Sequence, residues 1–139
     1  MDVLGLVDVK KLGHYTFSFN SLADPYLEYK ANRYNSKGFT IASHGVGGIA
    51  PMIWNDLDKI DIKAKNSGKE YIELLVCEAG QHEEVKENVV EKLYKLTKMP
   101  IKYTEDFVTF PLFSNKPSTS PSKNAKIHGW QWYIGDTKK

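Results

Sequence analysis

The sequence predicts a small α/β domain with a parallel or mixed central sheet and flanking helices. Its 139 residues fit a single domain over residues 1–139, and a hydrophobic content of 41% is enough for one core. In the middle of the chain, short apolar segments typical of strands alternate with longer segments of helical spacing. Residues 45–70 between two such strands are long enough for a right-handed βαβ crossover, which parallel neighbours require.

Two strands are predicted near the start of the chain. Residues 3–9 are mainly apolar, and residues 15–19 alternate aromatic and small polar side chains, as in a strand with one buried face. Residues 10–13 predict a turn between them. Residues 20–38 look irregular, and their three tyrosines either pack against the domain or line a groove: Tyr26, Tyr29 and Tyr34.

A strand, a helix and a second strand are predicted next. The strand covers residues 39–43 and ends at His44-Gly45. Apolar residues at three- and four-residue spacing then define one helix face: Ile49, Ile53, Leu57, Ile60 and Ala64. Pro51 is tolerated in the first turn, and residues 66–68 end the helix. Residues 71–76 are the strongest strand, with a continuously apolar second half typical of burial on both faces.

The last part of the chain predicts one more helix and two more strands. The helix covers about residues 83–98, with Glu83 and Glu84 in its first turn, where they complement the helix dipole. Residues 101–110 are strand-like but broken at 104–106. Residues 114–126 are rich in Ser, Pro and Lys and predict a loop. A final strand is expected at 127–134, with Trp130 and Trp132 on one face.

Composition excludes several functions. The net charge is +2 and no basic arm stands out, so nucleic-acid binding has no support. No apolar run reaches the roughly 20 residues that span a bilayer, and the first residues lack a signal-peptide pattern. A lone cysteine forms no intrachain disulfide. We therefore expect a soluble domain, either cytoplasmic or carried on a larger protein that is secreted or delivered into a target cell.

The chemistry of the chain is predicted to lie with His44 and Cys77. Each directly follows a predicted parallel strand, so both belong at the carboxyl edge of the sheet, where open α/β sheets place ligands. His44 can take the thiol proton, and the dipole of the predicted following helix would also favour the thiolate. The backbone N–H groups of Gly45 and Cys77 are candidate oxyanion donors. Nucleophile, base and oxyanion hole are thus expected at one edge.

These motifs resemble the caspase-like cysteine peptidases. Residues 39–45 (FTIASHG) and 72–80 (IELLVCEAG) resemble that family's apolar strands, one ending in His-Gly and the other in the catalytic Cys. Residues 129–133 (GWQWY) resemble the closing strand of small caspase-like domains at the ends of bacterial polymorphic toxins. The resemblance implies a three-layer caspase-like sandwich, a Cys-His dyad and a toxin or effector role. It also implies a protein or peptide substrate, a cognate immunity protein as a further partner, and no cofactor.

Several alternatives stay open at this level. Cys77 could be a small buried core residue and His44 an ordinary loop or helix-capping residue. His82 is the substitute base if His44 proves remote, and a zinc site is not expected from the histidine spacing. Glu78 could orient a histidine, although an exposed carboxylate is the simpler interpretation. The whole chain could be a non-enzymatic binding or immunity protein, or a deamidase or transamidase using the same dyad.

Overall fold

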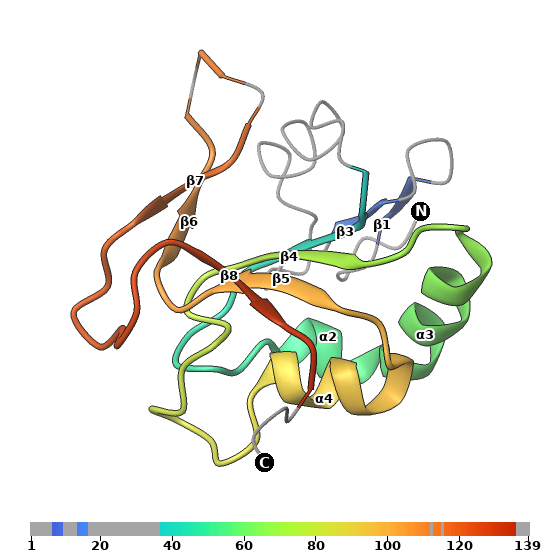
Figure 1. Ribbon diagram of the computed structural model, residues 1–139, viewed down its shortest axis with the longest axis horizontal. Helices are drawn as coiled ribbons and strands as arrows, with labels where there is room; N and C mark the ends of the chain where they lie inside the picture. Colours follow the sequence, from blue (N-terminus) through green and yellow to red (C-terminus); the bar gives the residue numbers. More distant parts are fainter. Residues whose placement is uncertain (1–6, 10–13, 17–36, 112, 115, 136–139) are drawn as a thin grey trace.

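The fold is built around one six-stranded sheet (Figure 1). The computed structural model describes residues 7–9, 14–16, 37–111, 113–114 and 116–135. The strand order in the sheet is β1-β2-β3-β4-β5-β8. These strands are β1 (Val7–Val9), β2 (His14–Thr16), β3 (Phe39–Ser43), β4 (Ile72–Val76), β5 (Ile101–Thr104) and β8 (Trp130–Tyr133). The proposed turn at 10–13 and the three tyrosines at 26, 29 and 34 lie outside the described residues.

The sheet is mixed and mostly parallel, which confirms the α/β class. Strands β2, β3, β4 and β5 run parallel to one another. The two edge strands, β1 and β8, pair antiparallel with β2 and β5. All five residues of β3 and of β4 are buried, as the apolar run predicted for the second strand.

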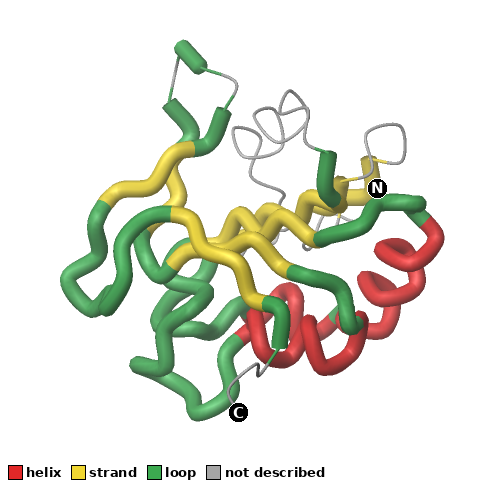
Figure 2. The backbone as a smooth tube through the Cα atoms, viewed as in Figure 1, coloured by secondary structure: helices red, strands yellow, loops and turns green. Residues whose placement is uncertain are grey.

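Three helices lie along one face of this sheet (Figures 1 and 2). They are α2 (Pro51–Asn55), α3 (Leu57–Asn66) and α4 (Val89–Thr97). Strands β3, β4 and β5 follow one another in a single direction across the sheet, so right-handed crossovers put their helices on the same face. The described helices therefore do not form the third layer expected of a caspase-like sandwich, and that finer prediction is not confirmed.

No helix in the described part of the chain is long and apolar enough to cross a membrane.

Two clusters of buried side chains occupy the two faces of the sheet. On the helix side, alternate residues of the central strands pack with Ile53, Ile60 and Leu93. On the other side, Ala42 and Leu75 pack with half-buried side chains from later segments, including Val108, Phe110 and Trp130. The second cluster packs the C-terminal segments against the ends of β3 and β4, close to the candidate dyad.

Both predicted helices differ from expectation in their bounds. The first is divided into α2 and α3 at Asp56, whose φ of −126° leaves the helical region. The second begins at Val89, not near Glu83, because Asn88 forms a capping box with Glu91. Glu83 and Glu84 thus lie in the preceding loop and do not occupy a helix first turn.

A small second sheet pairs the end of the strand-like segment predicted at 101–110 with part of the predicted loop. Strand β6 (Phe107–Thr109) pairs antiparallel with β7 (Ser118–Ser120), and the interruption at 104–106 separates β5 from β6 as expected. The loop prediction for 114–126 is wrong at 118–120. Ser118 and Ser120 have little strand preference of their own, and pairing with β6 supplies the order.

Candidate functional site

Strands β3 and β4 bring the positions of His44 and Cys77 side by side. The last register pair of these parallel strands is Ser43 with Val76, and each candidate residue follows directly. Neighbouring strands lie about 4.8 Å apart, so the two backbones leave the sheet together at its carboxyl edge. Both residues are half-buried. The predicted placement of the two positions on one edge is therefore present in the fold.

Gly45 lies directly against the end of β4. A Cβ atom at this position would clash with Cγ1 of Val76 and would lie 2.9 Å from the carbonyl oxygen of Cys77. Only glycine allows the β3–α2 loop to approach so closely. The loop after His44 is thus packed tightly against Val76 and the backbone of Cys77.

The thiol of Cys77 contacts the backbone of β6. Its Sγ lies 3.3 Å from the Val108 nitrogen, which donates to it, and 3.6 Å from the Val108 oxygen, to which it donates. Burial raises the pKa of the Cys77 thiol and the neighbouring Glu78 charge adds to this, although the Val108 hydrogen bond lowers it. The predicted help from a helix dipole is wrong, since α4 begins only at Val89. The resting thiol is therefore protonated at neutral pH.

Glu78 is buried, which corrects the expectation of an exposed carboxylate. Only 7% of the residue is accessible, and its φ of 57° is in the left-handed region. Its Oε1 accepts from the Gly47 N–H at 2.9 Å, and its Oε2 accepts from the Ser122 hydroxyl at 2.8 Å. The backbone N–H of Glu78 donates to the Asp106 carbonyl at 2.7 Å. One residue thus ties the loop after His44, the loop after Cys77 and the segment after β7 together.

Asp106 is a second buried carboxylate at this edge, and the sequence pattern does not single it out. One oxygen, Oδ1, lies 2.7 Å from His128 Nδ1 and accepts from the Ser122 N–H at 3.0 Å. The other accepts from the Gly129 N–H at 2.7 Å. Burial would raise the pKa of Asp106, but His128 and the two backbone amides outweigh it and hold the pKa below its ordinary value. Its position in a break between two strands was the only available signal.

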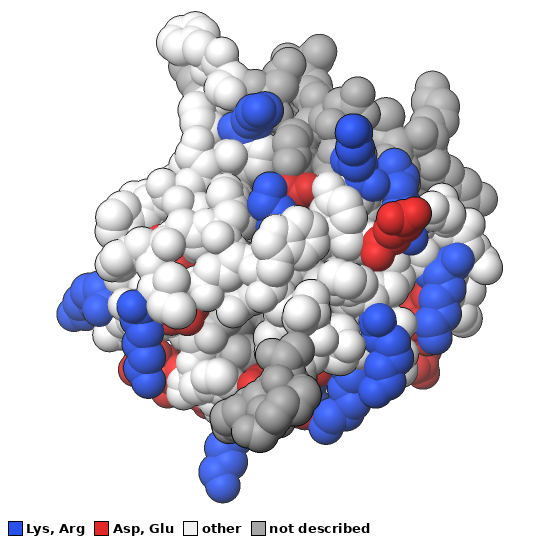
Figure 3. All heavy atoms as spheres, viewed as in Figure 1, with Lys and Arg blue, Asp and Glu red and all other residues white. Residues whose placement is uncertain are grey.

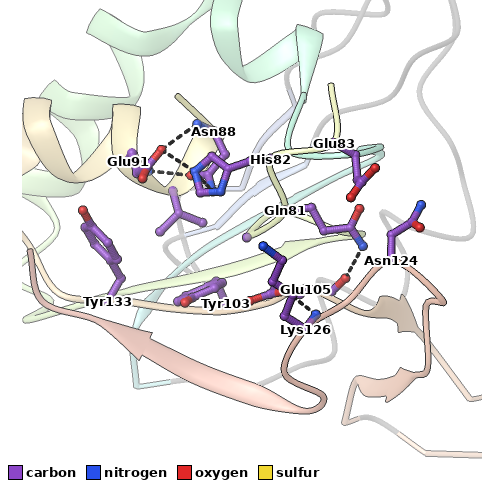
Figure 4. Close-up of a pocket in the computed structure, with 12 residues that line it drawn as sticks. Gln81, His82, Glu83, Asn88, Glu91, Tyr103, Glu105, Asn124, Lys126 and Tyr133 are labelled. Atoms are coloured by element: carbon purple, nitrogen blue, oxygen red, sulfur yellow. Dashed lines mark hydrogen bonds and ion pairs between the residues drawn. The ribbon is translucent and has the colours of Figure 1, made fainter. Parts of the chain in front are cut away.

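A cleft of about 240 Å³ opens beside the loop that follows Cys77 (Figure 4). His82 lines it, with Nε2 2.9 Å from Glu91 Oε1 and 3.3 Å from Asn88 Nδ2. The proposed substitute base therefore lies at the first turn of α4. Cys77 and His44 are not among the residues that line the cleft. The cleft was not predicted, because its walls come from five separate segments of the chain.

The described residues contain no group of three or more His, Cys, Asp and Glu side chains arranged to hold a metal ion. Comparison of the chain with protein-family models, with curated proteins and with solved structures finds no match. The resemblance to caspase-like peptidases consequently depends on the short motifs around His44 and Cys77 and on residues 129–133.

Proposed function

We propose that this domain is a cysteine peptidase-like hydrolase in which Cys77 attacks a peptide or amide carbonyl and His44 is the base. The observation that carries the proposal is the register of β3 and β4, which ends on Ser43 and Val76 and leads both positions off the same edge. The proposal also assigns the backbone N–H groups of Gly45 and Cys77 to an oxyanion hole, and the tight packing of Gly45 against the end of β4 keeps these two residues close together.

The proposed reaction follows the acyl-transfer scheme. Cys77 Sγ forms a bond to the carbonyl carbon while His44 accepts the thiol proton, and His44 then protonates the departing amine. Water hydrolyses the resulting thioester with His44 acting again as base. Because the resting pKa of Cys77 is raised, proton transfer has to accompany attack, and a standing thiolate is not part of the proposal.

The proposed biological role is that of a toxin or effector domain that acts on a protein or peptide, with an immunity protein as its natural inhibitor. The proposed location is the cell into which a larger toxin delivers the domain, or otherwise the cytoplasm of the producing cell. In Figure 3, Lys and Arg side chains lie at several places on the face shown, both near its centre and at its edges, and Asp and Glu side chains lie among them. This distribution gives no support to a nucleic-acid partner.

Mass spectrometry of a lysate treated with the domain tests the reaction type. New protein termini indicate cleavage, whereas a gain of about one dalton on Gln or Asn side chains indicates the deamidase alternative. Both activities should disappear in Cys77→Ala and in His44→Ala, and should persist in the matched variant His82→Ala. Full activity in either of the first two variants would refute the assigned dyad.

A second candidate is a non-enzymatic binding module, and one observation favours it. The Cys77 thiol both donates to and accepts from the Val108 backbone, as a structural cysteine does. Expression in a bacterial host separates the two candidates, since a toxin domain impairs growth and an immunity or adaptor protein does not. Growth inhibition that depends on Cys77 supports the enzyme.

A further inference from the structure

Strands β6 and β7 form a two-stranded ribbon that is separate from the main sheet. Among the described strands, each pairs with the other and with no strand of the six-stranded sheet. In Figures 1 and 2 this β6–β7 ribbon lies at one end of the sheet and projects away from the helices. No residue of either strand is fully buried. A two-stranded ribbon is marginally stable by itself, so its contacts with the body of the domain hold it in place.

The two ends of the ribbon are fixed at a buried neck. Asp106 directly precedes β6, Ser122 follows shortly after β7, and both residues are buried. The Ser122 N–H donates to Asp106 Oδ1 at 3.0 Å. Both residues also bond to Glu78, through the Asp106 carbonyl at 2.7 Å and the Ser122 hydroxyl at 2.8 Å. The neck therefore belongs to the body of the domain, and the ribbon can move beyond it.

Beyond the neck, Val108 lays the ribbon directly on Cys77. The Val108 N–H donates to Sγ at 3.3 Å, and Sγ donates to the Val108 oxygen at 3.6 Å. The side chains of Val108 and of Phe110, just after β6, pack against Ala42 and Leu75. Val108 and Phe110 are themselves partly accessible, so lifting the ribbon exposes little further apolar surface. A segment held in this way opens at a lower free energy than the whole domain.

The contact with Val108 opposes the reaction proposed for Cys77. Attack requires Sγ to come within about 3–3.5 Å of a carbonyl carbon, in line with the sulfur lone pair. In the described conformation that sulfur accepts the Val108 N–H, and the thiol proton points to the Val108 oxygen, whereas the proposed mechanism gives it to His44. Strand β6 and a substrate carbonyl would therefore compete for the same atom.

We propose that the β6–β7 ribbon is an autoinhibitory flap, which rests on Cys77 and opens about the Asp106–Ser122 neck to expose the thiol. Its regulatory meaning rests on the proposed hydrolase function, whereas the opening itself can be measured whether or not the domain is an enzyme. The open fraction sets the reactivity of Cys77. A substrate or an activating partner would raise this fraction by binding the open form better than the closed form.

The rate at which dithionitrobenzoate labels Cys77 tests the flap without any catalytic step. The chain has one cysteine, so every labelling event reports this thiol. The folded domain should react at least about tenfold more slowly than the urea-unfolded chain, because the reagent reaches the thiol only in the open form. The logarithm of the labelling rate should rise with urea at less than about half the slope of global unfolding, since a local opening exposes little surface.

Two matched variants separate opening of the flap from unfolding of the domain. Val108→Ala removes the side-chain methyl groups that pack on the body and keeps the backbone that contacts Cys77. Labelling should become about three- to tenfold faster, the effect of losing two partly buried methyl groups. Ile60→Val removes a methyl group from the buried cluster on the helix side of the sheet. It should lower the stability to urea and leave the labelling rate in the absence of urea unchanged, because that cluster stays intact when the flap opens.

Three labelling results would overturn the flap. These are a folded domain that reacts as fast as the unfolded chain, a urea slope equal to that of global unfolding, or equal acceleration in Val108→Ala and Ile60→Val. The first two are measured on the unaltered chain, so they do not depend on how either variant folds.

The lysate assay then distinguishes the flap from the hydrolase. If both proposals hold, the activity of Val108→Ala should rise by about the same factor as its labelling rate. Local opening without any cleavage or deamidation would refute the hydrolase alone. Activity in a domain whose thiol is labelled only on global unfolding would refute the flap alone, and so would faster labelling of Val108→Ala without higher activity.

Discussion

Replacing Glu78 should destabilise the domain, because this residue next to the candidate nucleophile accepts two buried hydrogen bonds. Its carboxylate is the acceptor for two donors, the Gly47 N–H and the Ser122 hydroxyl. Both hydrogen bonds are buried. In Glu78→Ala both donors lose their acceptor, and the loops around Cys77 lose their common link.

The size of the effect follows from these two contacts. A buried donor left without an acceptor costs about 1–3 kcal/mol, while removing a buried charge offsets part of the loss. We expect the free energy of unfolding to fall by about 2–4 kcal/mol in Glu78→Ala. Glu78→Gln keeps one acceptor for Gly47, so about 1–2 kcal/mol is expected there. Because φ is 57°, Glu78→Gly should be about 0.5–1 kcal/mol more stable than Glu78→Ala.

Urea denaturation followed by tryptophan fluorescence measures these differences. Glu70→Ala is the matched control, since this glutamate is exposed, and its change should stay within about 0.5 kcal/mol. The alkylation rate of Cys77 at fixed pH should rise in Glu78→Ala, because the loops that bury the thiol lose their link. If Glu78→Ala were as stable as the control Glu70→Ala, the buried hydrogen bonds of Glu78 would not stabilise the loops around Cys77.

Three further predictions concern other groups. Because the pKa of Cys77 is raised in the folded protein, the unfolded chain loses the thiol proton first as pH rises. The free energy of unfolding should therefore fall as pH rises above about 8.5, the ordinary pKa of a cysteine thiol. Cys77→Ala should remove this part of the pH dependence. Because the pKa of Asp106 is lowered in the folded protein, its carboxylate should contribute fully to the free energy of unfolding above about pH 3.9. This contribution should be lost as pH falls towards the pKa of the folded protein. If Asp106→Asn showed the same loss of stability with pH, Asp106 would not be the group responsible. Asn88→Ala should cost about 1 kcal/mol by loss of the α4 capping box, measured by urea denaturation against the exposed Asn66→Ala.

The local pattern of the sequence determined the elements that the core is made of. The buried strands β3 and β4 were predicted because apolar runs of this length are buried on both faces wherever they pair. The parallel pairing of β3 with β4 followed from the crossover length, and with it the shared edge for positions 44 and 77. Ile53, Ile60 and Ala64 were predicted on the helix face and are buried there.

Tertiary structure decided whatever depends on partners distant in the chain. The start of α4 at Val89 is the exception among the differences, because the Asn88–Glu91 capping box that sets it is local in the sequence. The burial of Glu78, by contrast, requires Ser122, and the pairing of Asp106 requires His128 and Gly129. The order of β7 requires β6. A sequence pattern reports the average environment of a residue, whereas the ionisation of Cys77 and the lining of the cleft are set by the few groups that folding brings next to them.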